Sequence, residues 1–152
     1  MSYLWDEADQ QGGAFDLELE VLLLTQAMRE RGEAPHLLSL GGALNMYWTP
    51  AQLLTHHASN GCNLNAGDLL GTGTISTHTP DGYGSLLEAT EGGREPVRLP
   101  SGETRRFLED GDEVMLRART TRRHGFAPIG FGECRGVVVP AGEAADLSRN
   151  LQ

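Results

Sequence analysis

The sequence predicts a β-rich α+β domain, an antiparallel or mixed β-roll or sandwich with one main helix. Turn signals such as Pro80-Asp81-Gly82 and Asp110-Gly111-Asp112 recur after residue 65, at spacings typical of antiparallel strands. Only residues 49–61 contain sequence signals for both the start and the end of a helix. The chain shows no internal repeat and no linker. We therefore expect a single domain over residues 1–152, with a leader at 1–14 and a polar tail at 141–152.

The first predicted strand covers residues 15–25. Apolar residues from Phe15 to Val21 alternate with Asp16, Glu18 and Glu20, so one face is apolar and the other acidic. Its second half is apolar on both faces and is expected to be buried. Residues 26–42 are interpreted as a loose hairpin, in which residues 37–40 form a short return strand.

The next predicted element is a helix over residues 50–59. Thr49 is a good N-cap, Pro50 suits the first helical position, and Asn60-Gly61 favours a helix end. The spacing predicts one core face and one solvent face. The core face comprises Ala51, Leu53, Leu54, His57 and Ala58, and the solvent face comprises Gln52, Thr55 and Ser59.

Everything after residue 65 is interpreted as strands and turns. The segment 71–76 is a glycine-rich strand in this interpretation, and Glu88 lies on a later strand with Leu86 and Thr90 on its face. Residues 113–120 alternate strongly enough to predict a further strand.

Composition excludes several classes of function. All 12 basic residues are arginine, so the sequence offers no Schiff-base or P-loop lysine. The net charge of −9 argues against nucleic-acid binding, and no apolar run approaches a membrane span. The N-terminus does not resemble a signal peptide, and Cys62 and Cys134 are expected to be buried thiols. We therefore expect a cytoplasmic protein without nucleic-acid or membrane partners.

Two groups of polar residues resemble metal or catalytic sites. Asp16, Glu18 and Glu20 share a strand face, which suits either a hard divalent cation or a solvated strand face, and the second is favoured. His56 and His57 point about 100° apart on a helix, so they cannot both bind one ion. A buried, hydrogen-bonded His57 is the favoured interpretation.

A third group is more promising as a site. The glycines at 71 and 73 suggest close approach of a ligand or another backbone, with the hydroxyls of Thr74 and Ser76 on one face. The absence of lysine rules out a phosphate loop. Glu88 is either an acid–base or water-orienting group or an ordinary strand glutamate, and the residue pattern leaves both open. No serine-hydrolase elbow or Cys–His motif is present.

These motifs resemble, in order and spacing, those of the fumarylacetoacetase (fumarylacetoacetate hydrolase) family, from about Tyr3 to Pro140. The resembling segments are residues 47–49, 52–57, 60–64, 67–70, 73–76, 84–88, 107–114 and 129–134. The resemblance implies a hydrolase that cleaves the carbon–carbon bond of the β-diketo acid 4-fumarylacetoacetate in tyrosine and phenylalanine catabolism, yielding fumarate and acetoacetate. It also implies a Ca²⁺ or Mg²⁺ ion that holds the diketone, and a histidine, oriented by a glutamate, that activates water.

By this resemblance, Glu88 occupies the position of the water-orienting glutamate and Thr74 that of a substrate-contacting threonine. The family's metal ligands, catalytic histidine and lysine precede the resembling segment. We therefore expect the C-terminal portion of such an enzyme, inactive alone, with no metal or cofactor on this chain and with homo-oligomers formed. The alternative is a non-catalytic β-module that self-associates or binds a partner chain.

Overall fold

The computed structural model describes residues 1–120 and 126–142, and the predicted tail at 141–152 lies almost entirely outside them. A four-stranded antiparallel sheet runs in the order β2-β1-β5-β6. A two-stranded sheet joins β3 and β4. The strands are β1 (Leu17–Leu24), β2 (His36–Gly42), β3 (Val97–Arg98), β4 (Thr104–Arg105), β5 (Glu113–Thr120) and β6 (Gly130–Val137). The predicted β-rich α+β class is confirmed.

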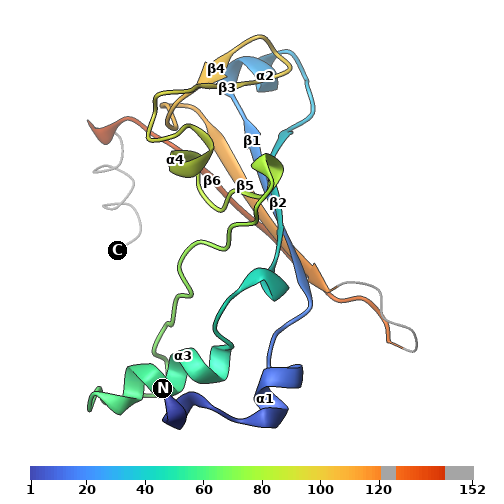
Figure 1. Ribbon diagram of the computed structural model, residues 1–152. Helices are drawn as coiled ribbons and strands as arrows, with labels where there is room; N and C mark the ends of the chain where they lie inside the picture. The colour runs from blue at the N-terminus through green and yellow to red at the C-terminus, as the bar shows by residue number, and fades with distance from the viewer. Residues whose placement is uncertain (121–125, 143–152) are drawn as a thin grey trace.

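Short helical segments connect the strands. They are η1 (Ser2–Leu4), α1 (Glu7–Gly12), α2 (Gln26–Glu30), η2 (Ala43–Asn45), α3 (Pro50–Ser59), η3 (Pro80–Gly82) and α4 (Leu86–Ala89). The longest helix in the described residues is α3, where the sequence predicts the main helix. Figure 1 shows α1 and α3 together at one end of the molecule, while α2 and the β3–β4 hairpin lie at the other.

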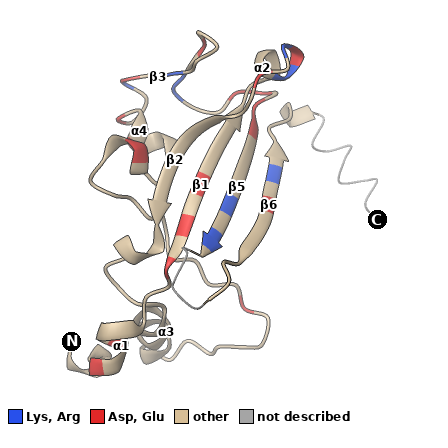
Figure 2. Cartoon of the chain, turned by 90° about the vertical axis from the view of Figure 1, so that its right-hand side faces the viewer, with Lys and Arg blue, Asp and Glu red and all other residues tan. Residues whose placement is uncertain are grey.

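The predicted alternation of β1 is confirmed by its pairing. Every residue of β1 pairs with one of β5, so Glu18 faces Arg119 and Glu20 faces Arg117 across the ladder. Figure 2 shows acidic positions on β1 beside basic positions on β5. The hydrogen bond with Glu18 raises the pKa of Arg119. This pairing favours a charge-paired strand face at Glu18 and Glu20 over a metal site.

The core lies at the end of the sheet next to α2 and β3. Leu22, Leu23 and Leu24 are buried there, as expected for the apolar half of β1. Met28 from α2, Leu99 from the loop after β3 and Met115 from β5 complete the cluster. The opposite end of the sheet carries no comparable cluster among the described residues.

A buried ion pair fixes the loop before β5. Asp112 is fully buried, and its two carboxylate oxygens accept hydrogen bonds from Arg105 Nε at 2.8 Å and Nη2 at 3.0 Å. The backbone N–H of Glu109 donates to Asp112 Oδ2 at 2.9 Å. The hydrogen bond to Asp112, which outweighs burial, raises the pKa of Arg105. Sequence reasoning did not predict this pair, because its charges are surrounded by other acids and arginines in the sequence.

Residues 1–14, the expected leader, contain two short helical segments, η1 and α1. Asp6 caps α1 by accepting a hydrogen bond from the N–H of Asp9. The side chain of Asp9 then accepts from the Thr49 hydroxyl at 2.6 Å, which joins α1 to the start of α3. This N-terminal segment therefore covers part of α3, a contact that local sequence patterns do not show.

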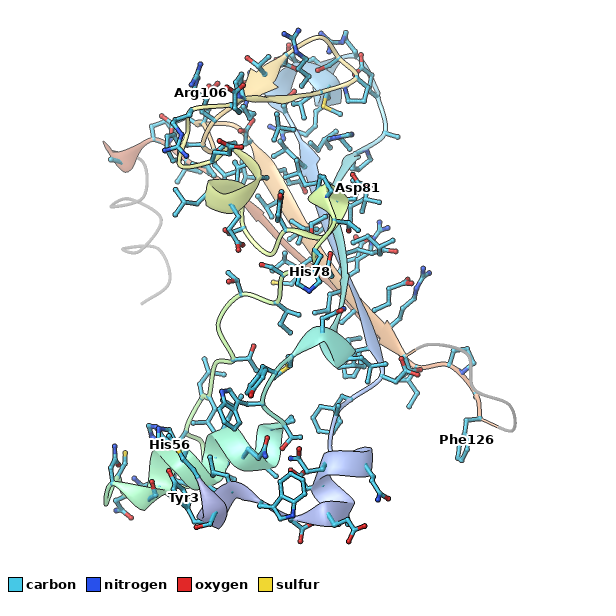
Figure 3. All side chains as sticks on the ribbon, in the orientation of Figure 1. Tyr3, His56, His78, Asp81, Arg106 and Phe126 are labelled. Carbon is cyan, nitrogen blue, oxygen red and sulfur yellow. The ribbon has the colours of Figure 1, made fainter. Side chains whose placement is uncertain are left out.

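The predicted faces of α3 are correct only in part. Thr55 and Ser59 are exposed as predicted, and Leu53 of the predicted core face is half-buried. Gln52 is buried, because its side-chain amide donates to the Leu4 carbonyl at 3.0 Å, whereas Leu54 is exposed. The interpretation of His57 as buried is wrong, since both histidines are exposed. His56 Nδ1 instead lies 2.7 Å from the hydroxyl of Tyr3, and Figure 3 shows the two side chains together.

Three further outcomes concern the thiols, the membrane and the return strand. Cys62 and Cys134 are exposed, so the expectation of buried thiols is wrong. Within residues 1–120 and 126–142, no helix has the length and hydropathy needed to cross a membrane. The return strand expected near Leu37 is confirmed as part of β2.

Candidate active site

Thr74 and Glu88, the two residues that the sequence analysis proposes for a site, both line one hollow of about 380 Å³. Thr74 comes from the long segment between α3 and η3, and Glu88 comes from α4. The other lining residues are Asn45, Met46, Tyr47, Trp48, Leu53, Thr72, Ile75 and Ser76. The structure therefore brings together the two positions that the sequence analysis singled out.

Glu88 lies on a helix and not on the predicted strand. Ser85 is the N-cap of α4, and its Oγ accepts a hydrogen bond from the N–H of Glu88 at 3.2 Å. A serine followed three residues later by glutamate is a helix-start signature. The sequence therefore carries a helix signal at Ser85, and this signal outweighs the alternation of Leu86, Glu88 and Thr90 that predicts a strand.

The predicted glycine-rich strand over residues 71–76 is also absent, since the described backbone there forms no ladder. The close approach expected at Gly71 and Gly73 does not occur among the described residues, since a Cβ on either glycine would meet nothing within 4 Å. A close approach of two backbones occurs instead at Gly84. A Cβ on Gly84 would lie 2.8 Å from the carbonyl oxygen of Ile75 and 2.9 Å from its nitrogen. Gly84 therefore permits the segment to pass directly beside the chain that leads into α4.

The carboxylate of Glu88 is anchored although the residue is exposed. Oε2 accepts hydrogen bonds from Ser76 Oγ at 2.8 Å and from Ser85 Oγ at 3.0 Å. Oε1 lies 3.0 Å from Ser76 Oγ. Charge-assisted hydrogen bonds of this kind are stronger than neutral ones, so they restrict the rotamers of a side chain that water would otherwise leave mobile.

Thr74 lines the same hollow with its side chain exposed. Among the described residues its hydroxyl makes no hydrogen bond, so it is available to a ligand. A threonine hydroxyl donates one hydrogen bond and accepts others. Thr74 is therefore suited to contact a carbonyl or carboxylate oxygen of a bound molecule.

Sequence reasoning missed the aromatic wall of the hollow. Tyr47 and Trp48 both line it, and their rings pack edge to face with centroids 4.8 Å apart. The signal available in the sequence was two adjacent aromatic residues just before the N-cap Thr49. No histidine lines the hollow in the described part of the chain, and His56 lies with Tyr3 on another side of α3.

The arrangement can orient a polar ligand but supplies an incomplete catalytic set. An anchored carboxylate can accept a hydrogen bond from a water molecule, and a nearby hydroxyl can bind a polarised oxygen. Among residues 1–120 and 126–142, no group of three or more His, Cys, Asp or Glu side chains is placed to hold a metal ion.

Comparison with known proteins identifies the family. The family model described as "Fumarylacetoacetate (FAA) hydrolase C-terminal" matches residues 38–139. The fumarylacetoacetase of Dictyostelium discoideum is 44% identical over 143 residues, which cover 93% of this chain and 31% of that relative. The human fumarylacetoacetase is 44% identical over 127 residues, covering 84% of the chain and 29% of the relative.

A plant relative gives the same result. The fumarylacetoacetase of Arabidopsis thaliana is 42% identical over 134 residues, covering 88% of the chain and 30% of the relative. The chain thus spans about 30% of the length of the curated relatives that it matches. Because the family model matches more than half of its residues, the chain belongs to the fumarylacetoacetate hydrolase family, and the part that it matches is the C-terminal one.

Proposed function

We propose that this chain contributes Glu88 and Thr74 to the active site of a hydrolase that cleaves a carbon–carbon bond in a β-diketo acid. The proposed substrate is 4-fumarylacetoacetate, an intermediate of tyrosine and phenylalanine catabolism, and the products are fumarate and acetoacetate. The observation that carries the proposal is the convergence of both residues on one hollow, in a chain that is 44% identical to a fumarylacetoacetase.

The two residues have distinct proposed roles. The anchored carboxylate of Glu88 accepts a hydrogen bond from the group that delivers water to the ketone, which fixes the direction of attack. The hydroxyl of Thr74 donates to an oxygen of the diketo acid and holds it in the hollow. The aromatic wall of Tyr47 and Trp48 excludes water from one side of the bound molecule.

We propose that a Ca²⁺ or Mg²⁺ ion serves the complete enzyme, but the described residues do not fit as its site. Both ions require several oxygen ligands converging on one point, and the described carboxylates form no such group. Glu18 and Glu20, the nearest approach to one, are paired with arginines. We therefore assign no metal ligand to the described residues, and no catalytic step that passes through the metal.

A hybrid enzyme tests the proposal. In it, the matched region of the Dictyostelium relative is replaced by this chain, and the loss of fumarylacetoacetate is followed with Ca²⁺ or Mg²⁺ present. We expect turnover by the hybrid and none by the isolated chain. Thr74→Val is expected to raise the KM of the hybrid by about 10-fold, since it removes one hydrogen bond to substrate. Ion-dependent turnover by the isolated chain would contradict the proposal.

A second candidate function is self-association as a non-catalytic module, with a second copy of this chain as the partner. Mainly apolar residues line a hollow of about 600 Å³ at the end of the sheet where β1 begins and β5 ends. Among them, Phe126 is 76% and Phe131 is 66% exposed. Figure 3 shows Phe126 at the tip of the β5–β6 connection, away from the sheet. Exposed apolar patches favour association. Light scattering that shows only monomers at micromolar concentration would refute this function.

We further propose a cytoplasmic location and a homo-oligomeric state for the complete enzyme. The two cysteines are exposed free thiols, which suits a reducing compartment. The exposed apolar side chains beyond the sheet supply surface for contact between subunits. Fractionation of cells with an antibody to the chain tests the location.

A further inference from the structure

The Ser76 hydroxyl links two segments of the proposed site. It lies 12 residues before Glu88 in the sequence, on the segment that carries Thr74, yet it contacts both oxygens of the Glu88 carboxylate. The side chain of Ser76 is only partly exposed, and Ser76 itself lines the hollow. The contact therefore joins the two segments that supply the proposed site residues.

The hydroxyl of Ser76 is itself held in place. The backbone N–H of Gly84 donates to Ser76 Oγ at 3.0 Å, so the oxygen acts as acceptor there and its single proton is directed to the carboxylate. Gly84 can reach this position because it lacks a Cβ, which would meet the backbone of Ile75. The Gly84 N–H thus holds the Ser76 hydroxyl, and the Ser76 hydroxyl in turn holds the Glu88 carboxylate.

The two oxygens of Glu88 are not equivalent in this arrangement. Oε2 accepts the shorter contact from Ser76 and a second hydrogen bond from Ser85, whereas Oε1 has the longer contact alone. Each carboxylate oxygen can accept about two hydrogen bonds. Oε1 is therefore the oxygen with capacity left for a donor in the hollow.

We propose that Ser76 is a positioning residue, whose hydroxyl holds Glu88 Oε2 so that Oε1 remains available to accept a hydrogen bond from the group that delivers water. This inference rests on the proposed function of Glu88. It assigns Ser76 no contact with the reacting atoms. Ser85 also reaches Oε2, but it is the N-cap of α4, so its loss would disturb the helix as well as the carboxylate.

The kinetic test uses the hybrid enzyme. Ser76→Ala is expected to lower kcat by about 10- to 100-fold with KM changed less than about 3-fold, because a misplaced catalytic group affects the reaction more than substrate binding. Ser76→Thr retains the hydroxyl and is expected to restore most of kcat. Thr77→Ala is the matched control, since the Thr77 hydroxyl contacts Thr79 and not Glu88.

The second readout is independent of activity and uses the full chain. Three-bond NMR couplings of Glu88 are expected to report one dominant rotamer in the unaltered chain and in Thr77→Ala, and averaged rotamers in Ser76→Ala. Unchanged couplings in Ser76→Ala, or a kcat equal to that of Thr77→Ala, would overturn the inference. If Glu88→Gln leaves kcat intact, the proposed function fails instead. If Glu88→Gln lowers kcat while Ser76→Ala leaves it equal to that of Thr77→Ala, the positioning role alone fails.

Discussion

Replacing Asp112 by Asn should destabilise the fold far more than an average surface change. The side chain of Asp112 is 1% exposed, and that of Arg105 is 9% exposed. Asparagine keeps the shape of the side chain but removes its charge. Its amide oxygen can take the place of Oδ2, which accepts from Arg105 Nε and from the Glu109 N–H. The amide nitrogen then faces Arg105 Nη2, a donor, where Oδ1 now accepts.

The magnitude follows from what remains around Arg105. Breaking a buried ion pair by removing one partner costs about 3–5 kcal/mol, because the other charge is left uncompensated. Here Glu103 lies 3.3 Å and Glu109 3.5 Å from the guanidinium, and both keep part of their exposure. These carboxylates still offset some of the charge of Arg105. We therefore expect the lower end of the range, about 3 kcal/mol, and a fall in Tm of about 6–12 °C.

Urea unfolding followed by circular dichroism measures this free energy. Glu91→Gln is the matched control, because Glu91 and Arg94 form an ion pair whose side chains are 63% and 77% exposed. Such an exposed pair contributes less than about 1 kcal/mol. The reasoning would be refuted if Asp112→Asn and Glu91→Gln shifted the free energy of unfolding by the same small amount.

Two further predictions concern the stability of the chain. Thr49→Ala removes the capping box of α3 and should lower the free energy of unfolding by about 1 kcal/mol in the same assay, whereas Thr49→Ser should not. The hydrogen bond from Thr25 holds the pKa of Glu103 below its ordinary 4.5, so its contribution is present above pH 4.5 and is lost as pH falls through the lowered pKa. Urea midpoints between pH 6 and pH 3 should therefore fall more steeply for the unaltered chain than for Glu103→Gln, and equal slopes would contradict this.

Elements with a strong local period could be predicted from the sequence. The alternation around β1 and over β5 determines which residues pair and face each other, because a one-residue slip would turn the charged side chains to the other face. The start of α3 was predictable for a similar reason. The Thr49 hydroxyl accepts from the Gln52 N–H, the Gln52 side chain accepts from the Thr49 N–H, and Pro50 has no N–H that needs a partner.

Two predictions fail where distant contacts override local patterns, and a third fails where one local signal outweighs another. Gln52 is polar and was placed on the solvent face, but the carbonyl of Leu4 gives its amide a buried partner. The segment at 71–76 is extended without a ladder, because its close neighbour is the turn at Gly84 and not a strand. For Glu88, alternation over a few residues was weaker evidence than the serine three residues before it.

The proposed site, like the fold, could be predicted from the sequence only in part. The resemblance of the motifs selected Thr74 and Glu88, and the structure places both in one hollow. The hydroxyl contacts that anchor Glu88 depend on the approach of two segments at Gly84, which no spacing rule predicts. The aromatic wall likewise depends on how the segment before α3 folds beside Ile75.

The central claim is that Glu88 acts in the reaction, and the kcat of the hybrid enzyme tests it most directly. Glu88→Gln should lower kcat by about 100-fold or more, the range found when a positioned acid–base or orienting group is lost. Glu95→Gln, an exposed glutamate outside the hollow, should leave kcat unchanged. A Glu88→Gln hybrid that turns over fumarylacetoacetate as fast as Glu95→Gln would contradict the account.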